Sequence, residues 1–411
     1  MNGNPPVENT VRIIPFTLKG IIMFDKVFNR QNSGSYKWDT TVPEGLIERG
    51  AYPLSVADME FQTPKEVREA IRDFTENGFF CYTDGDKAYR DCVCEFLSRR
   101  HNFEIKNDWI TCVGGVVFTI NTAIRAFTND GDKVIIQSPV YYPFSKSILN
   151  NNRIIADNPL VPDGNTYKMN FEELEEIASQ DDVKLMLLCS PHNPVGRVWT
   201  KDELKRVGEI CLKNNVVLVS DEIHFDLVRK NQEHIVINNV DERFAKNTVI
   251  CTAVSKTFNL AGLGTSNIII ADKALRERFQ AQLSQDGYSC INCVSRPATM
   301  AAYTKCDYWV DAVNEYIEEN IKLVENILSD VPQIKIYDCQ GTYLMWLDMR
   351  ELGMNDEELD LFLQNECGII QDPGFWFGEN GKGFTRLNVA CPRTVLEKSV
   401  TKMKNQILKR V

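Results

Sequence analysis

Lys256 is the residue whose setting best suits covalent chemistry. It follows Ser255 and an apolar segment, Thr248 to Val254, and it precedes a run of small and apolar residues that reaches Leu263. A lysine held in such a dry environment has a lowered pKa, which makes its amine nucleophilic toward a carbonyl. The segment therefore indicates a carbonyl cofactor, and pyridoxal phosphate is the leading candidate. A solvated Ser-Lys-Thr turn is the competing interpretation, and the neighbouring segments decide between the two.

Two carboxylates end an apolar run upstream of this lysine. Residues Val217 to Ser220 are apolar or small, Asp221 and Glu222 follow them, and His224 comes two positions later. Such a run predicts a buried parallel strand. Ligands of open α/β sheets bind at the carboxyl ends of the strands. Asp221 is therefore placed to pair with a protonated pyridine nitrogen, which keeps the ring an electron sink.

A second apolar run leads into a stiff loop. Residues Leu185 to Ser190 predict another buried strand, and Pro191 and Pro194 then flank Asn193. An amide held by two prolines suits a hydrogen bond to a ring hydroxyl, because proline restricts the backbone on both sides. The alternative is an ordinary strand-to-helix turn, for which Asn-Pro is common.

Two further segments suit a phosphate and a flat ring. Gly114 and Gly115 stand between a strand-like segment, Trp109 to Val113, and the start of an amphipathic helix. The N–H groups at such a helix N-terminus favour an anion. Tyr141 follows a predicted strand, Lys133 to Gln137, and offers a ring for stacking, although aromatic residues near strand ends are more often part of the core.

Taken in order, these segments and a late arginine resemble the fold-type I pyridoxal-phosphate enzymes of the class I/II aminotransferase superfamily. More narrowly, the chain resembles the cystathionine β-lyases, or carbon–sulfur lyases, of the MalY/PatB type. The resemblance extends from about Met23 nearly to the C-terminus. The segments that carry it are Val56–Phe61, Cys81–Thr83, Cys189–Pro194, Ser220–His224, Ser255–Asn259 and Phe384–Asn388.

The resemblance implies a role for each residue that faces the cofactor ring. Lys256 bonds the cofactor and later moves the Cα proton of the substrate. Asp221 pairs with the pyridine nitrogen, and Asn193 reaches the ring hydroxyl. Tyr141 stacks on the ring, and His224 lies near the same hydroxyl, where many relatives have a tyrosine.

The resemblance also assigns the phosphate and the substrate. The groups expected to hold the phosphate are the N–H groups of Val116 and Val117, the hydroxyl of Ser255, and Tyr82 from the neighbouring subunit. Arg386 is expected to bind the substrate α-carboxylate through a planar two-point contact that lysine cannot copy.

Three positions depart from the pattern of the relatives. The chain has Ser55 where tryptophan is common, Glu60 where aspartate is common, and Cys81 where glycine is common. None of the three is expected to touch the cofactor chemistry. Ser55 and Cys81 are expected to reshape the substrate pocket.

The implied function is a β-elimination that cleaves cystathionine or cysteine-type thioethers to a thiol, pyruvate and ammonia. Two alternatives stay open. An aminotransferase shares the same machinery up to the Cα carbanion, and a second arginine for a side-chain carboxylate, which would support it, is not identifiable. A regulatory protein with little catalysis would be favoured by a lost lysine or an added DNA-binding domain, and the sequence has neither.

Strands alternate with helical stretches from about Thr63 to about Leu283, and a long helical region follows from Val294 to Leu328. The predicted helical stretches include Lys65–Thr75, Lys87–Arg100 and Lys201–Asn214. This alternation predicts an α/β fold with a mostly parallel sheet flanked by helices. The resemblance adds a large pyridoxal-phosphate-binding domain and a smaller α+β domain, as in aspartate aminotransferase. The predicted parts are an N-terminal extension (1–22), an arm with part of the small domain (23–62), the large domain (63–293) and the C-terminal small domain (294–411). Met23 is the expected true start, and the extension before it is expected to be disordered or a misplaced start.

Composition limits the partners. A net charge of −11 over 411 residues argues against nucleic acid or an anionic membrane surface, and no apolar run approaches the length of a membrane span. Thirteen cysteines, an odd count, predict reduced thiols in a cytoplasmic protein rather than a disulfide framework or a metal site. The resemblance implies a homodimer whose active sites are shared, with an amino acid as substrate.

Overall fold

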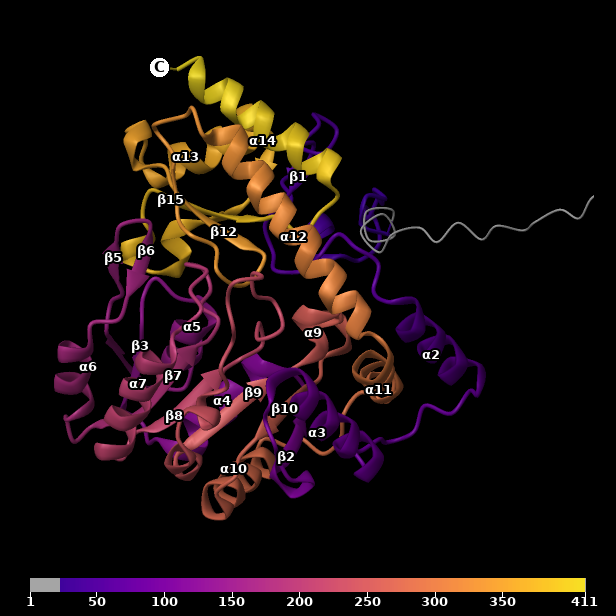
Figure 1. Ribbon diagram of the computed structural model, residues 1–411, viewed down its shortest axis with the longest axis vertical. Coiled ribbons are helices and arrows are strands. Elements are labelled where there is room, and N and C mark those ends of the chain that lie inside the picture. Colours follow the sequence, from indigo (N-terminus) through magenta and orange to yellow (C-terminus); the bar gives the residue numbers. More distant parts are fainter. Residues whose placement is uncertain (1–22, 411) are drawn as a thin grey trace, which may run out of the picture.

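The computed structural model describes residues 23–410. The predicted N-terminal extension, residues 1–22, lies outside the described residues, so the prediction that the chain starts at Met23 stays a prediction. Seven strands form the central sheet in the order β2-β10-β9-β8-β7-β3-β4 (Figure 1). Strand β10 runs antiparallel to both of its neighbours, and the other pairs are parallel. This mixed, mostly parallel sheet confirms the predicted α/β fold. The strands are β2 (Ile110–Val113), β3 (Lys133–Ile136), β4 (Ile154–Asp157), β7 (Val183–Cys189), β8 (Val217–Asp221), β9 (Thr248–Thr252) and β10 (Ser266–Ile269).

Helices cover both faces of this sheet, because successive side chains of each strand point to opposite sides. In β7, Leu185 and Leu187 pack into one core, whose helices are α4 (Val116–Phe127), α5 (Pro143–Asn150) and α10 (Lys273–Gln285). Met186 and Leu188 face the other core, whose helices include α3 (Lys87–His101), α7 (Lys201–Lys213) and α11 (Ser295–Lys305). A strand that is buried on both faces is apolar along most of its length, and this is why β7 could be predicted from the sequence.

Local sequence fixes where several helices begin. Thr200 and Glu203 form a capping box at the start of α7, and Asp86 accepts a hydrogen bond from the N–H of Tyr89 at the start of α3. Such side chains satisfy N–H groups that the helix leaves without partners. The other α-helices of the described residues are α2 (Lys65–Glu76), α6 (Phe171–Ala178), α8 (Ile237–Val240), α9 (Val254–Thr257), α12 (Asp307–Leu328), α13 (Asp356–Phe362) and α14 (Arg393–Leu408).

A second sheet lies beside α12 and α14 (Figure 1). It has four antiparallel strands in the order β11-β12-β15-β14. Strand β1 (Tyr52–Pro53) pairs with β13 (Ile369–Ile370), which joins the segment before α2 to the C-terminal part of the chain. The exact boundaries at 62 and 293 stay predictions. The strands are β11 (Lys335–Ile336), β12 (Leu344–Asp348), β14 (Asp372–Pro373) and β15 (Phe384–Asn388), and β5 (Val161–Asp163) and β6 (Thr166–Lys168) form a separate hairpin.

All thirteen cysteines are free thiols. Cys290 and Cys293 have a Cys-x-x-Cys spacing just before α11. Within residues 23–410, however, no three histidine, cysteine, aspartate or glutamate side chains gather where they could hold a metal ion. Over the same residues, none of the helices combines the length and the apolar character that crossing a membrane requires.

Candidate active site

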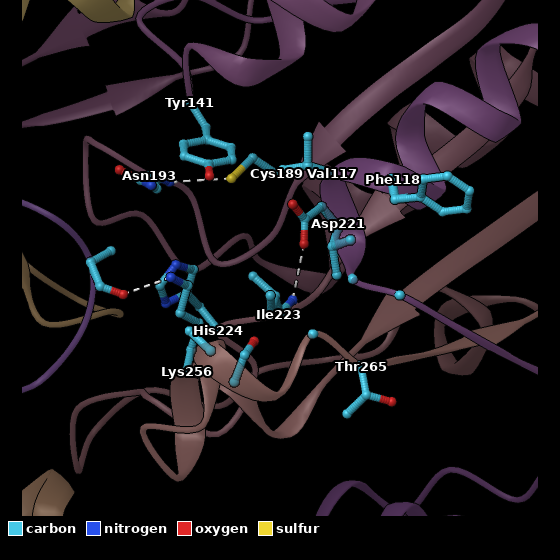
Figure 2. Close-up of a pocket in the computed structure, with 17 residues that line it drawn as sticks. Val117, Phe118, Tyr141, Cys189, Asn193, Asp221, Ile223, His224, Lys256 and Thr265 are labelled. Carbon is cyan, nitrogen blue, oxygen red and sulfur yellow. Dashed lines mark hydrogen bonds between the residues drawn. The ribbon is translucent and has the colours of Figure 1, made fainter. Parts of the chain in front are cut away.

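One cavity of about 240 Å³ brings together eight of the ten predicted site residues (Figure 2). They come from the carboxyl ends of β7 and β8, from α9 just after β9, from the loop after β3 and from the start of α4. The carboxyl ends of parallel strands meet at one edge of a sheet, so residues far apart in sequence converge there. The eight are Val116, Val117, Tyr141, Asn193, Asp221, His224, Ser255 and Lys256, and the other lining residues are Ala57, Gly114, Gly115, Phe118, Cys189, Ile223, Ala261, Gly264 and Thr265.

Lys256 points its amine at a backbone carbonyl. Its Nζ donates to the carbonyl oxygen of Ala57 at 2.6 Å, and the same oxygen accepts from the hydroxyl of Tyr343 at 2.9 Å. Burial lowers the pKa of Lys256 to about 8, while Asp58 opposes this shift and Arg386 adds to it. An amine with that pKa is partly neutral near neutral pH, so it can serve as nucleophile and as base.

Asp221 is a buried carboxylate without a cation. It accepts a backbone N–H at 3.2 Å, and no lysine, arginine or histidine nitrogen among residues 23–410 lies within ion-pair distance of it. Burial raises its pKa to about 7. The two other buried acids of the same hexapeptide are already paired: Glu222 lies 2.8 Å from Nε2 of His234, and Asp226 lies 2.8 Å from Nε2 of His101. Asp221 thus remains available for a cationic ring nitrogen.

The N-terminus of α4 is open. Gly115 precedes the helix with φ 118° and ψ 157°, a backbone conformation that essentially only glycine adopts. No side chain caps the helix, so the first N–H groups, including those of Val116 and Val117, lack intrahelical partners. A Cβ at Gly115 would meet no atom within 4 Å. Space and N–H groups together fit a phosphate, and Ser255 lines the same cavity.

Tyr141 and His224 add two rings to the cavity. The backbone N–H of Tyr141 donates to the carbonyl of Asn193 at 3.0 Å, which ties the two loops together. Figure 2 shows the Tyr141 ring on the same side as Asn193 and Cys189. Burial and the charges of Lys256 and Arg386 hold the pKa of His224 well below its usual value, so its imidazole is neutral. Its Nδ1 has no hydrogen-bond partner among the described residues, which leaves it for a bound group.

Arg386 does not line the cavity but reaches it through Asn193. Its Nη1 donates to Oδ1 of Asn193 at 2.9 Å, and its Nη2 pairs with the carboxylate of Asp372, which lies directly opposite on β14. Both side chains of this ion pair are buried. The Nε of Arg386 has no partner in the described part of the chain, so this one donor of the guanidinium is unused while Nη1 and Nη2 are both engaged.

Tyr82 is the second predicted residue outside the cavity. Its side chain is 95% exposed, in the loop between α2 and α3 that also exposes Phe79 at 75% and Phe80 at 62%. Within one chain, therefore, Tyr82 does not contribute to the cavity.

The three departures from the relatives lie elsewhere. Ser55 is buried and Cys81 is exposed, and neither lines the cavity. Glu60 is buried in a charged cluster, where its carboxylate lies 2.9 Å from Nζ of Lys37 and 3.1 Å from Nη1 of Arg30. Ser55 and Cys81 were expected to reshape the substrate pocket, but neither side chain lines this cavity.

Sequence reasoning missed four groups that shape the site. Ala57 and Cys189 lie inside segments that carried the resemblance, so their place beside the motifs was a usable signal. Tyr343 and Asp372 gave no such signal, because their contacts depend on which strands become neighbours. Asp372 pairs with Arg386 only because β14 and β15 are aligned in that register.

Comparison with known proteins gives a consistent result. Residues 50–403 match the family Aminotransferase class I and II. Cystathionine beta-lyase PatB of Bacillus subtilis (strain 168) is 39% identical over 382 residues, 93% of this chain and 98% of that protein. Protein MalY of Escherichia coli (strain K12) is 31% identical over 387 residues, with 93% and 98% covered. The crystal structure of cystalysin from Treponema denticola, which contains a pyridoxal 5'-phosphate cofactor, matches with a TM-score of 0.90 and 38% identity over 94% of this chain and 98% of that one. The chain therefore belongs to the class I and II aminotransferase family, with PatB and MalY among its relatives.

Proposed function

We propose that the protein is a pyridoxal-phosphate-dependent carbon–sulfur β-lyase that cleaves cystathionine or cysteine-type thioethers. One observation carries this proposal: a single cavity holds the Lys256 amine, the unpaired Asp221 carboxylate and the open N-terminus of α4. These groups match the aldehyde, the ring nitrogen and the phosphate of the cofactor. The relatives support the reaction, since PatB is a cystathionine beta-lyase and the cystalysin structure contains the cofactor.

In the proposed β-elimination, the cofactor and Lys256 have different roles. The bound cofactor supplies an electron sink for negative charge at the substrate Cα. Lys256, whose pKa is lowered to about 8, takes the Cα proton, and the thiolate leaves Cβ with the electron pair of the C–S bond. Lys256 is then positioned to return its proton to the thiolate. The remaining three-carbon enamine takes up water and yields pyruvate and ammonia, so a thioether and one water give a thiol, pyruvate and ammonium.

Arg386 is the residue proposed to bind the substrate α-carboxylate. Its Nε has no partner among the described residues, and its Nη1 donates to Asn193, which lines the cavity. The Asp372 carboxylate pairs with Nη2 of the same guanidinium. A guanidinium binds a carboxylate through paired N–H groups, so the substrate carboxylate would have to take over contacts that Asn193 or Asp372 now makes. Amino acids with a free α-carboxylate are therefore the proposed substrates.

The proposed assembly is a homodimer in the cytoplasm. Three aromatic side chains of one loop, Phe79, Phe80 and Tyr82, are more than half exposed, and large exposed apolar patches mark interaction sites. A second copy that covers this loop would bring Tyr82 to the phosphate of its partner. Thirteen free thiols favour a reducing compartment.

The decisive experiment incubates the purified holoenzyme with L-cystathionine, without any keto acid, and follows pyruvate and homocysteine together. Equal amounts of both products are expected, and the Lys256→Ala variant is expected to give neither. Amino-group transfer that appears only when 2-oxoglutarate is supplied would make the protein an aminotransferase. If cystathionine and a panel of S-substituted cysteines all fail while the cofactor binds, the regulatory alternative replaces the proposal.

A further inference from the structure

A buried chain of hydrogen bonds ends beside the catalytic lysine. Thr257, the residue after Lys256, donates its hydroxyl to Oδ2 of Asp226 at 2.7 Å. The other carboxylate oxygen of Asp226 lies 2.8 Å from Nε2 of His101. The side chain of Asp226 is fully buried, that of His101 is 7% exposed, and Thr257 is fully buried as well. None of the three lines the cavity.

The far end of this chain is itself held in place. The ring of His101 stacks on Phe225 with 4.1 Å between ring centroids and 12° between planes. His101 is also the last residue of α3, so the end of that helix fixes its backbone. A second dyad, Glu222 with His234, lies next to it, with 6.1 Å between the two histidine rings. Asp226 therefore has a fixed orientation from which to hold Thr257.

At the other end of the hydrogen-bond chain, helix α9 has few local interactions that would stabilise it. Helix α9, which carries Lys256, is four residues long, and no side chain caps its N-terminus. A helix of one turn does not form by itself. Its position therefore depends on ties to other segments, and Thr257 supplies the tie to the segment that also carries Asp221.

On the other side, Asn259 ties the same turn to the segment that contains Ala57. The side chain of Asn259 accepts from the N–H of Met59 and donates to the carbonyls of Met59 and Phe61, each bond being 2.9 Å. Hydrogen bonds therefore hold the turn that carries Lys256 on two sides. The Thr257–Asp226 bond fixes the distance of the lysine from Asp221, and the Asn259 bonds fix its distance from the carbonyl of Ala57.

We propose that Thr257, Asp226 and His101 are positioning residues that set where the Lys256 amine lies relative to Asp221. The proposal rests on the proposed function in that it assigns these residues to the geometry of the same site. Because Asp221 and Asp226 belong to one hexapeptide, the group that holds the ring nitrogen and the group that holds the lysine move as one unit. The three residues act through α9 and do not touch the reacting atoms.

The test uses Thr257→Val, which keeps the shape of the side chain and removes its donor. In the holoenzyme, kcat is expected to fall about tenfold or more while KM changes less than about twofold, because misplacing the base affects the transition state and not substrate binding. Thr257→Ser restores the hydroxyl and is expected to keep kcat within about threefold of the wild type.

A matched control is Thr248→Val. Thr248 is also fully buried, lies in β9, and donates to Oδ1 of Asn238 at the same distance of 2.7 Å. This variant is expected to lose a similar amount of stability and to keep the wild-type kcat. Equal kcat losses in Thr257→Val and Thr248→Val, or a Thr257→Ser variant as slow as Thr257→Val, would reduce Thr257 to a structural role.

A readout without turnover separates this proposal from the proposed function. The visible absorbance of the bound cofactor changes with pH as the lysine–cofactor bond titrates, and Thr257→Val is expected to move the midpoint by about half a pH unit or more, since the charges around that bond change distance. An unchanged midpoint would overturn the positioning role even if no thioether is cleaved. If the valine variant does not fold, His101→Phe, which keeps the stacked ring and removes the donor to Asp226, is expected to move the midpoint and kcat in the same directions; no movement would overturn it equally.

Discussion

At the scale of single residues, burial shifts the pKa values of Lys256 and Asp221, which line the same cavity, in opposite directions. It lowers the pKa of Lys256 to about 8 and raises that of Asp221 to about 7. Replacing Lys256 by alanine is expected to abolish pyruvate formation, with a loss of about a thousandfold or more, because both the covalent anchor and the base are removed. The assay is pyruvate release, read together with the visible absorbance of the bound cofactor. Residual turnover near the wild-type rate would mean that another residue carries the cofactor.

Asp221 gives a pH prediction for the cofactor-free protein. Its folded-state pKa of about 7 lies above its ordinary value of 3.8, so the folded state holds this proton over a range where the unfolded state has released it. The contribution to stability is therefore complete below pH 3.8 and is lost as pH rises toward 7, by up to about 1.4 kcal/mol per pH unit. Urea unfolding at pH 5 and pH 7 should show a smaller loss for Asp221→Asn than for the wild type. Equal losses in the two proteins would contradict the burial argument.

At the scale of elements, the start of α4 makes the sharpest prediction. Gly115→Ala forces a side chain into a conformation with φ 118° and points a methyl group into the open space before the helix. Cofactor affinity is expected to fall about tenfold or more, with about 1–3 kcal/mol of strain in the fold. Gly131→Ala is the control, since Gly131 has φ 86° and open space around it but is not part of the cavity. Titration of each apoprotein with cofactor measures the effect, and equal affinities would separate α4 from phosphate binding.

Elements were also where sequence reasoning worked best and where it stopped. The buried strands β7 and β8 and the helices α2, α3 and α7 begin at or within two residues of their predicted positions, because periodicity and capping residues are local signals. The single helical region predicted from Val294 to Leu328 is two helices, α11 and α12, which meet at Cys306. The Lys256–Ala57 contact spans 199 residues, and the Arg386–Asp372 pair depends on strand register. Such contacts follow from packing, which one sequence does not encode locally.

At the scale of the whole molecule, the exposed Tyr82 predicts complementation between two inactive variants. Tyr82→Phe and Lys256→Ala homodimers are each expected to have little activity. When their subunits are mixed and exchanged, heterodimers regain one intact site, so about a quarter of the wild-type activity is expected from a random mixture of a two-fold symmetric dimer. If Tyr82 served its own chain instead, no mixture would recover activity. Pyruvate release after mixing, compared with each variant alone, distinguishes the two arrangements.

The carbonyl of Ala57 has a mechanical consequence. It accepts one hydrogen bond from Lys256, which follows a strand of the central sheet, and another from Tyr343, which precedes β12 of the second sheet. Any rotation of one sheet against the other must stretch or shorten one of these bonds. In the cofactor-free protein, the position of the lysine amine and the position of the second sheet are therefore linked through one backbone oxygen.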